Sequence, residues 1–163
     1  MDEEERARTR LSQLAFVFQF HFLLPEFTVP DNVMLPMRAL GRLWGEAMHK
    51  RAQDLLAALG LAEHMRRRPD QLSGGQRQRV AVARALANEP PVILADEPTG
   101  SPDSKASEQV FEVLRAIVDK GGKTVVAVTH DIGLAERMDR HIALLDGRIV
   151  ADEQHHLAVT AAG

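Results

Sequence analysis

Two short stretches decide the fold of this chain: Leu72-Ser73-Gly74-Gly75-Gln76 and, further along, Val92-Ile93-Leu94-Ala95-Asp96-Glu97-Pro98. The first opens a run of helix-forming residues, and serine is a favoured residue for the position that caps a helix start. The two glycines carry no side chains over the first amides, so this helix start can bind an anion such as a phosphate. A capped helix without a ligand is the alternative for a lone Ser-Gly-Gly. Here the stretch continues as LSGGQRQRVAVARAL over 72–86, which is too long a pattern to arise easily by chance, and this favours the anion site.

The second stretch predicts a buried strand that ends in two carboxylates, Asp96 and Glu97. Ligands of parallel α/β sheets bind at the carboxyl ends of the strands, which is where this pair would lie. Carboxylate oxygens suit Mg²⁺, so Asp96 can hold this ion directly or through water. Glu97 can then position and deprotonate an attacking water. The alternative is a helix cap beside a solvated acid, and it is disfavoured because buried strands rarely end in paired acids without a use.

Two further polar residues follow predicted strands. His130 comes after the strand 124–128 and would lie at the same edge as Glu97, where it can hydrogen-bond a terminal phosphate and the attacking water. Gln19 ends the first strand, and its amide can contact both a metal and that water. Alone, such a histidine is more often bonded to backbone near a helix cap, and such a glutamine is more often solvated. The company of the two carboxylates favours the functional interpretation of His130.

The order of the elements predicts an α/β fold. A polar helix over 2–13 precedes an apolar strand over 14–18, and a helix over 104–120 separates the strands 92–95 and 124–128. Strand, helix and strand in this order form a parallel sheet with helices over its faces.

The remaining segments are assigned from their turn residues. Pro25 and Pro30 predict irregular structure over 20–31, and 32–68 are helical in pattern. Asp146-Gly147 predicts a hairpin between two short strands, and 152–163 are expected to form a loose tail.

Composition excludes several classes of protein. The 163 residues suit one domain, 45% of them are hydrophobic, and the net charge of −3 gives no electrostatic case for a nucleic-acid partner. There are no cysteines, so disulfides and thiolate metal sites are excluded. No apolar run is long enough to cross a bilayer, and the acidic start is not a secretory signal. Arg66-Arg67-Arg68 and His155-His156 are interpreted as solvated surface.

A phosphate-cradling loop of the form G-x-x-x-x-G-K-[ST] is missing from these 163 residues. Gly121-Gly122-Lys123-Thr124 resembles its end, but Ile117 stands where the first glycine is required. The order of elements is also reversed, with a helix before and a strand after. We therefore interpret the two glycines as a helix stop.

The motifs together resemble the nucleotide-binding subunit of an ABC transporter. Gln19 matches the Q-loop of that family, 72–76 its signature, Asp96 and Glu97 its Walker B carboxylates, 100–103 its D-loop, and His130 its switch histidine. Pro102 stands where the D-loop usually has leucine, which puts the geometry of that loop in question. The segment 16–28 is similar to ATPase subunits of the lipoprotein-releasing group, with the macrolide-exporter group as its near neighbour.

The resemblance implies a partial P-loop NTPase (ABC ATPase) core with a parallel sheet plus a helical subdomain. The helical subdomain would take residues 31–90, the RecA-like core 14–19 and 91–151, and the tail 152–163. ATP and Mg²⁺ are the implied cofactors. The implied catalytic residues are Glu97, His130 and Gln19, and the implied metal ligands are Asp96 and Gln19. The implied nucleotide-binding residues are Ser73, Gly74, Gly75, Gln76, Asp96 and Asp103.

The resemblance also implies partners. In the family, two ATPase subunits pack head to tail, so the signature of one contacts the terminal phosphate held by the other. Transmembrane permease subunits would hold the protein at the cytoplasmic face of the bacterial inner membrane, without membrane insertion of its own. The part with the phosphate loop is expected to precede residue 1, so this chain alone is expected to be inactive.

Two alternatives stand beside the transport ATPase. The first is a non-catalytic interaction module that binds a partner but not ATP, which the missing phosphate loop favours. The second is the ABC ATPase class of DNA maintenance, which carries long coiled coils between Q-loop and signature. Gln19 and Leu72 are too close in sequence for such coiled coils, so this class is disfavoured.

Overall fold

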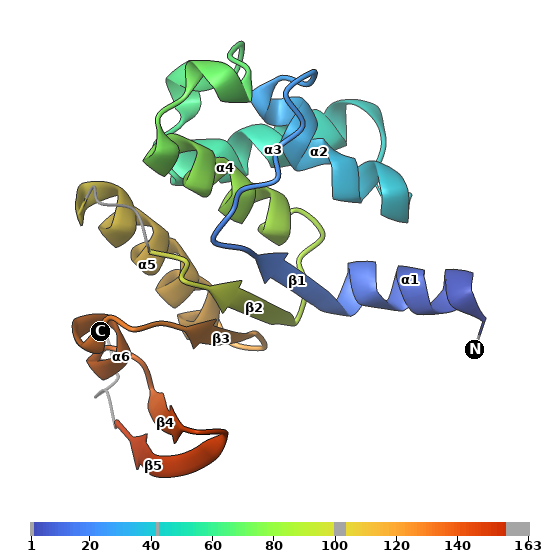
Figure 1. The fold of residues 1–163 in the computed structure, drawn as a ribbon. Helices are drawn as coiled ribbons and strands as arrows, with labels where there is room; N and C mark the ends of the chain where they lie inside the picture. The colour runs from blue at the N-terminus through green and yellow to red at the C-terminus, as the bar shows by residue number, and fades with distance from the viewer. Residues whose placement is uncertain (1, 42, 100–103, 156–163) are drawn as a thin grey trace, which may run out of the picture. The chain divides into compact units, whose positions relative to one another are not determined.

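The computed structural model describes residues 2–41, 43–99 and 104–155 (Figure 1). Its contacts divide the chain into a first unit, Met1–Val128, and a second unit, Thr129–Gly163. The elements of the first unit are α1 (Glu3–Gln13), β1 (Leu14–Val17), α2 (Val29–Leu40), α3 (Gly45–Ala58), η1 (Ala62–His64), η2 (Pro69–Gln71), α4 (Gly74–Leu86), β2 (Val92–Asp96), α5 (Ser104–Asp119) and β3 (Thr124–Val128). Those of the second unit are α6 (Ile132–Glu136), β4 (Arg140–Leu145) and β5 (Arg148–Gln154). Within the described ranges, no helix combines the length and apolar character needed to cross a bilayer.

The first unit is built on a parallel sheet of three strands in the order β1-β2-β3 (Figure 1). Val17 pairs with Ala95, and Asp96 pairs with Val128, so all three strands end at one edge of the sheet. The predicted α/β fold with a parallel sheet is confirmed. The first strand is shorter than predicted: it stops at Val17, and Gln19 follows two residues later.

One face of the sheet belongs to the hydrophobic core. The side chains that alternate onto this face from β1 and β2 are Ala15, Val17, Ile93 and Ala95, and all four are buried. They share one core cluster with buried residues of α4 and α5, among them Val80 and Val110 (Figure 1). The helix that carries the predicted signature therefore rests on the sheet that carries the predicted carboxylates.

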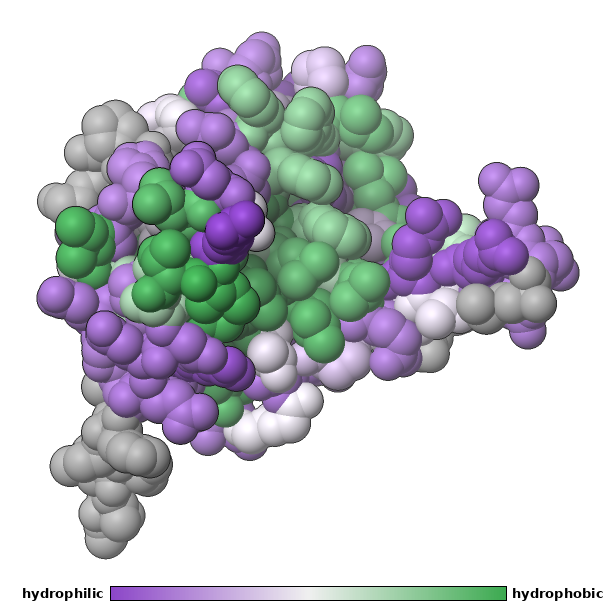
Figure 2. Space-filling view, turned by 60° about the horizontal axis from the view of Figure 1, so that its bottom comes forward, coloured by the Kyte–Doolittle hydropathy of each residue, from purple (hydrophilic) through white to green (hydrophobic). Residues whose placement is uncertain are grey.

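The opposite face of the sheet is apolar and open. Phe16 is 45% exposed, Val126 50% and Val128 64%. Figure 2 shows one face of the molecule on which hydrophobic side chains reach the surface. Parallel sheets normally have both faces covered, so this face differs from the usual arrangement.

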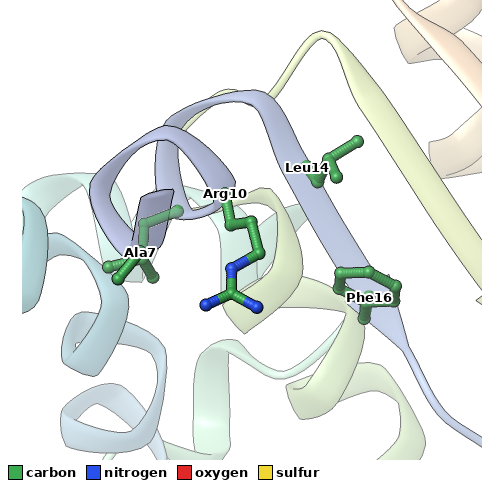
Figure 3. A pocket seen from close by; sticks show the side chains of 5 residues that line it. Ala7, Arg10, Leu14 and Phe16 are labelled. Carbon is green, nitrogen blue, oxygen red and sulfur yellow. The ribbon is translucent and has the colours of Figure 1, made fainter. Parts of the chain in front are cut away.

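A shallow hollow of about 290 Å³ lies between α1 and β1. Figure 3 shows the side chains that line it, including the guanidinium of Arg10 and the ring of Phe16. The full lining is Ala7, Arg10, Leu11, Leu14 and Phe16. None of the predicted site residues lines this hollow, so it is not the candidate site.

Helix α2 begins earlier than the sequence pattern predicted. Thr28 caps it, with its hydroxyl accepting the backbone N–H of Asp31 at 3.4 Å, and Pro30 sits in the first turn. Proline suits that position because the first amides of a helix have no partner within the helix. The prediction that Pro30 keeps 20–31 irregular was therefore wrong for Val29–Asp31.

Asn32 fastens the irregular segment that connects the sheet edge to α2. Its side chain is 0% exposed, and its oxygen accepts the N–H of Leu24 at 2.8 Å. Its nitrogen donates to the carbonyls of Leu24 and Thr28 at 3.1 and 3.0 Å, and more weakly to Phe27 at 3.3 Å. One buried amide therefore bonds the N–H of Leu24 and the carbonyl of Phe27, both in the irregular segment, to the first turn of α2.

We expect Asn32→Ala to lower the free energy of unfolding by about 1–3 kcal/mol, because it removes a buried amide and its hydrogen bonds to the N–H of Leu24 and the carbonyl of Phe27. Urea denaturation followed by circular dichroism measures this change. Gln53→Ala is the matched control, since Gln53 is an exposed amide on α3. Equal effects of the two substitutions would contradict the role assigned to Asn32.

The second unit contains the predicted hairpin. Asp146 and Gly147 form its two-residue turn with φ of 49° and 73°, and strands β4 and β5 pair antiparallel on either side. Positive φ at both turn positions is the geometry that Asp-Gly favours. Strand β5 runs to Gln154, so the prediction of a loose tail was wrong for residues 152–154.

Candidate functional site

The signature stretch opens α4 with a closed ring of two hydrogen bonds. The hydroxyl of Ser73 accepts the N–H of Gln76 at 3.2 Å, and the side-chain oxygen of Gln76 accepts the N–H of Ser73 at 2.9 Å. The predicted cap at Ser73 is confirmed. The reciprocal part played by Gln76 follows the capping-box rule, which the serine and the glutamine three residues later could have signalled.

The glycines of this helix start differ in their surroundings. A Cβ atom added at Gly74 would meet no atom of the described residues within 4 Å, whereas Gly75 is buried. Gln76 also reaches His64, with 3.0 Å between the amide nitrogen and the ring Nε2. Side-chain hydrogen bonds therefore hold the first turn of α4, and the space beside Gly74 is open. An open helix start with fixed geometry suits a bound phosphate.

Three of the predicted residues gather at the carboxyl edge of the sheet. Because Val17 pairs with Ala95 in the parallel register, Gln19 and Glu97 each follow that pair by two residues. Asp96 is the last residue of β2 and is exposed. Oxygen ligands for a hard cation are thus available at one edge, as the sequence predicts.

Glu97 has an unusual backbone conformation. Its φ is 47°, in the left-handed region that few residues other than glycine adopt. Its N–H donates to the carbonyl of Val128 at 2.9 Å, which continues the ladder between β2 and β3 by one step. Such strained residues cluster at functional sites, where neighbouring structure holds them in place. The sequence contains no signal for this conformation.

Two side chains of α4 bind the segments that leave the sheet edge, and sequence reasoning missed both. Gln78 is buried, and its nitrogen donates to the carbonyl of Pro98 at 3.1 Å. Arg84 donates to the carbonyls of His21 and Phe22, each at 2.8 Å. The signature helix is therefore bonded both to the chain after Glu97 and to the chain after Gln19.

His21 lies in an unusual environment beside these contacts. Burial lowers the pKa of its imidazole, and the nearby charges of Arg77 and Arg84 act in the same direction, while a hydrogen bond with Gln78 opposes them. Burial also lowers the pKa of Arg84. A lowered pKa favours the neutral imidazole, which suits its place beside two guanidinium groups.

The remaining predicted residues are His130 and Asp103. His130 belongs to the second unit and is exposed, directly before Asp131, whose carboxylate accepts the N–H of Leu134 at the start of α6. Asp103 and the rest of 100–103 lie outside the described residues. The structure thus brings together Gln19, Asp96 and Glu97 at the sheet edge and Ser73 to Gln76 at the start of α4.

The family model described as ABC transporter matches residues 1–100. The chain is similar to the lipoprotein-releasing system ATP-binding protein LolD of Anaeromyxobacter dehalogenans, with 50% identity over 155 residues that cover 95% of this chain and 65% of that protein. It is also 46% identical over 152 residues to LolD 1 of Caulobacter vibrioides, covering 93% of this chain and 65% of that protein. The chain therefore spans slightly less than two thirds of the length of these curated relatives.

Two solved structures have the same fold. One is a dimeric structure of a post-hydrolysis state of the ATP-binding cassette MJ0796 bound to ADP and Pi, with a TM-score of 0.86. The other is described as a dimeric structure of MJ0796, a bacterial ABC transporter cassette, with a TM-score of 0.87. Each is 44% identical, and each match covers 94% of this chain and 68% of the other.

Proposed function

Because this chain belongs to the ABC transporter family, we propose that it forms part of the ATP-hydrolysing subunit of a transporter that serves lipoprotein release. One observation carries the proposal: a capped, open helix start and a carboxylate-bearing sheet edge stand on elements that are bonded to each other. The relatives named as ATP-binding proteins of the lipoprotein-releasing system support the choice of transporter.

The roles of the residues follow from their chemistry. Glu97 is the general base that takes a proton from the attacking water, and Gln19 orients that water through its amide. His130 hydrogen-bonds the terminal phosphate. Ser73, Gly74, Gly75 and Gln76 present the start of α4 to nucleotide held by a second subunit, and Asp103 contributes across the same interface.

Mg²⁺ fits the sheet edge, since Asp96 is exposed there and offers hard oxygen ligands close in register to Gln19. When bound, the ion would neutralise charge on the phosphates. The role of this chain is then to hold the ion with Asp96 and to keep the amide of Gln19 beside the ion.

The partners follow from the division of labour between subunits. A second ATPase subunit, packed head to tail, supplies the nucleotide that the start of α4 meets, and the dimeric cassettes at 44% identity support this arrangement. Transmembrane permease subunits anchor the pair at the cytoplasmic face of the bacterial inner membrane. The helical part over 31–90 forms the surface that meets the permease.

ATP-dependent pairing tests this function. The chain is mixed with a hydrolysis-deficient variant of the Anaeromyxobacter relative, and complexes are measured by size-exclusion chromatography with light scattering. We expect a one-to-one complex with Mg-ATP that is lost when nucleotide is removed. Ser73→Arg should weaken it about 10–100-fold, because it removes a charge-assisted contact and blocks the helix start.

Ala58→Arg is the matched control, since it adds the same charge at an exposed position of α3. Pairing that is equally strong without nucleotide would favour the non-catalytic interaction module instead. Calorimetric titration of the chain alone with Mg-ATP completes the comparison, and little or no binding is expected without a phosphate loop.

A further inference from the structure

Three side chains with metal-binding atoms meet on the hairpin of the second unit. His141 comes from β4, Glu153 comes from β5, and His155 follows β5 directly. One ligand atom from each lies within 4.8 Å of the other two. Neither the sequence motifs nor the proposed function assigns a role to this cluster.

The pairing of β4 with β5 explains why these three side chains lie close together. His141 stands directly opposite Glu153 in the antiparallel register, and the N–H of His155 donates to the carbonyl of Asp139 at 2.9 Å. This bond extends the ladder past the end of β5, so Glu153 and His155, two residues apart, share one face of the ribbon. The register shift between Ala143 and Leu144 lies beyond these pairs and leaves them in step.

An ion pair holds the same two strands together. Arg140 binds Asp152 through two bonds, with Nε to Oδ1 at 2.8 Å and Nη2 to Oδ2 at 2.7 Å. These residues alternate with His141 and Glu153, so they occupy the other face of the ribbon. Two-point pairing restricts sliding of the strands and leaves the cluster with a fixed backbone.

A second observation points to a ligand. The Nε2 atom of His155 is buried and has no hydrogen-bond partner among residues 2–41, 43–99 and 104–155. A buried polar atom without a partner costs free energy, which a bound ion would recover. The interpretation of His155 as solvated surface was therefore wrong, because the residue is partly buried and its Nε2 atom is fully buried.

We infer that His141, Glu153 and His155 bind a divalent transition cation of the Zn²⁺ class. Two imidazoles and one carboxylate are a common ligand set for Zn²⁺, with a fourth position open to water. In tetrahedral geometry with bonds of ~2.0–2.1 Å, ligand atoms stand ~3.3 Å apart, which modest side-chain rotation reaches from the present spacing. Imidazole nitrogens disfavour Mg²⁺, so this site is chemically different from the proposed magnesium site at Asp96.

Calorimetric titration of the full chain with ZnCl₂ tests the site, using protein without a polyhistidine tag and without nucleotide. We expect one ion per chain, and an excess of MgCl₂ should not displace it. The variants His141→Ala, Glu153→Gln and His155→Ala should each weaken binding by at least ~10–100-fold. Titration with Co²⁺ should give the intense visible absorption of a four-coordinate site.

Two further variants make the result decisive. His49→Gln changes an exposed histidine of α3 and should leave Zn²⁺ binding unchanged. His156→Ala tests whether Zn²⁺ binds the folded cluster or only the adjacent histidines His155-His156, and it should leave binding by the cluster intact. Binding that survives His141→Ala but is lost in His156→Ala would overturn the inference, and so would unchanged affinity in Glu153→Gln with an unchanged circular dichroism spectrum.

Discussion

Replacing Glu97 by glutamine is expected to lower the rate of ATP hydrolysis by about 10²-fold or more, as the loss of a general base does. Glutamine keeps the size of the side chain and can still orient water, but it cannot accept the proton. The measurement is phosphate release at saturating Mg-ATP, with the chain joined to the phosphate-loop segment of the Anaeromyxobacter relative. ATP affinity in this fusion should stay nearly unchanged.

Glu63→Gln is the control for this change, because it makes the same substitution at an exposed glutamate. Turnover equal to that of the unchanged fusion in Glu97→Gln would remove Glu97 from the proposed role. A parallel loss of ATP affinity would indicate a binding role instead, since a group that acts only in the transition state changes the rate and not the ground-state affinity.

Ile93→Ala is expected to lower the free energy of unfolding of the first unit by about 2–5 kcal/mol. Ile93 is 0% exposed and sits in the middle strand of the sheet, within the core cluster that α4 and α5 share. Removing most of its side chain leaves a cavity that packed neighbours on both sides cannot fill. Guanidinium denaturation monitored by circular dichroism measures the loss.

Val126→Ala is the matched control in the neighbouring strand β3. Val126 lies on the open face of the sheet at 50% exposure, so the same kind of truncation should cost less than about 1 kcal/mol. If the two variants lost equal stability, the assignment of a buried and an open face would be wrong.

The sequence predicts the parallel sheet well because its signals are local. The apolar runs 92–95 and 124–128 are bounded by turn residues, and the helix between them has a clear stripe of apolar residues. The order strand, helix, strand then dictates a parallel topology. The cap at Ser73 is equally local, because a serine directly before a helical run can accept an amide N–H of the first turn with its own hydroxyl.

The errors also have physical reasons. Pro30 predicts a break when taken alone, but Thr28 and Asp31 around it supply the start of a helix. Strand β5 extends further than the sequence predicts, because its pairing with β4 stabilises polar residues such as Asp152 and Glu153 in extended form. Pairing partners of this kind depend on the fold and are not visible in a short window of sequence.

The contacts that hold the candidate site together were beyond prediction for a different reason. Arg84 and Gln78 bind backbone carbonyls, which every residue offers, so no residue pattern marks the recipients His21, Phe22 and Pro98. His155 likewise acquires its neighbours His141 and Glu153 through strand register. The sequence marks candidate site residues by their chemistry, whereas the contacts that support them required coordinates.

The left-handed backbone at residue 97 has a consequence for protein engineering. Glycine adopts such a φ without the strain, of order 1–3 kcal/mol, that other residues carry there. A screen that rewards melting temperature alone would therefore favour glycine at this position and discard the carboxylate. Thermostable variants of the fusion with the phosphate-loop segment therefore need a selection that reads the proposed ATP turnover as well as resistance to heat.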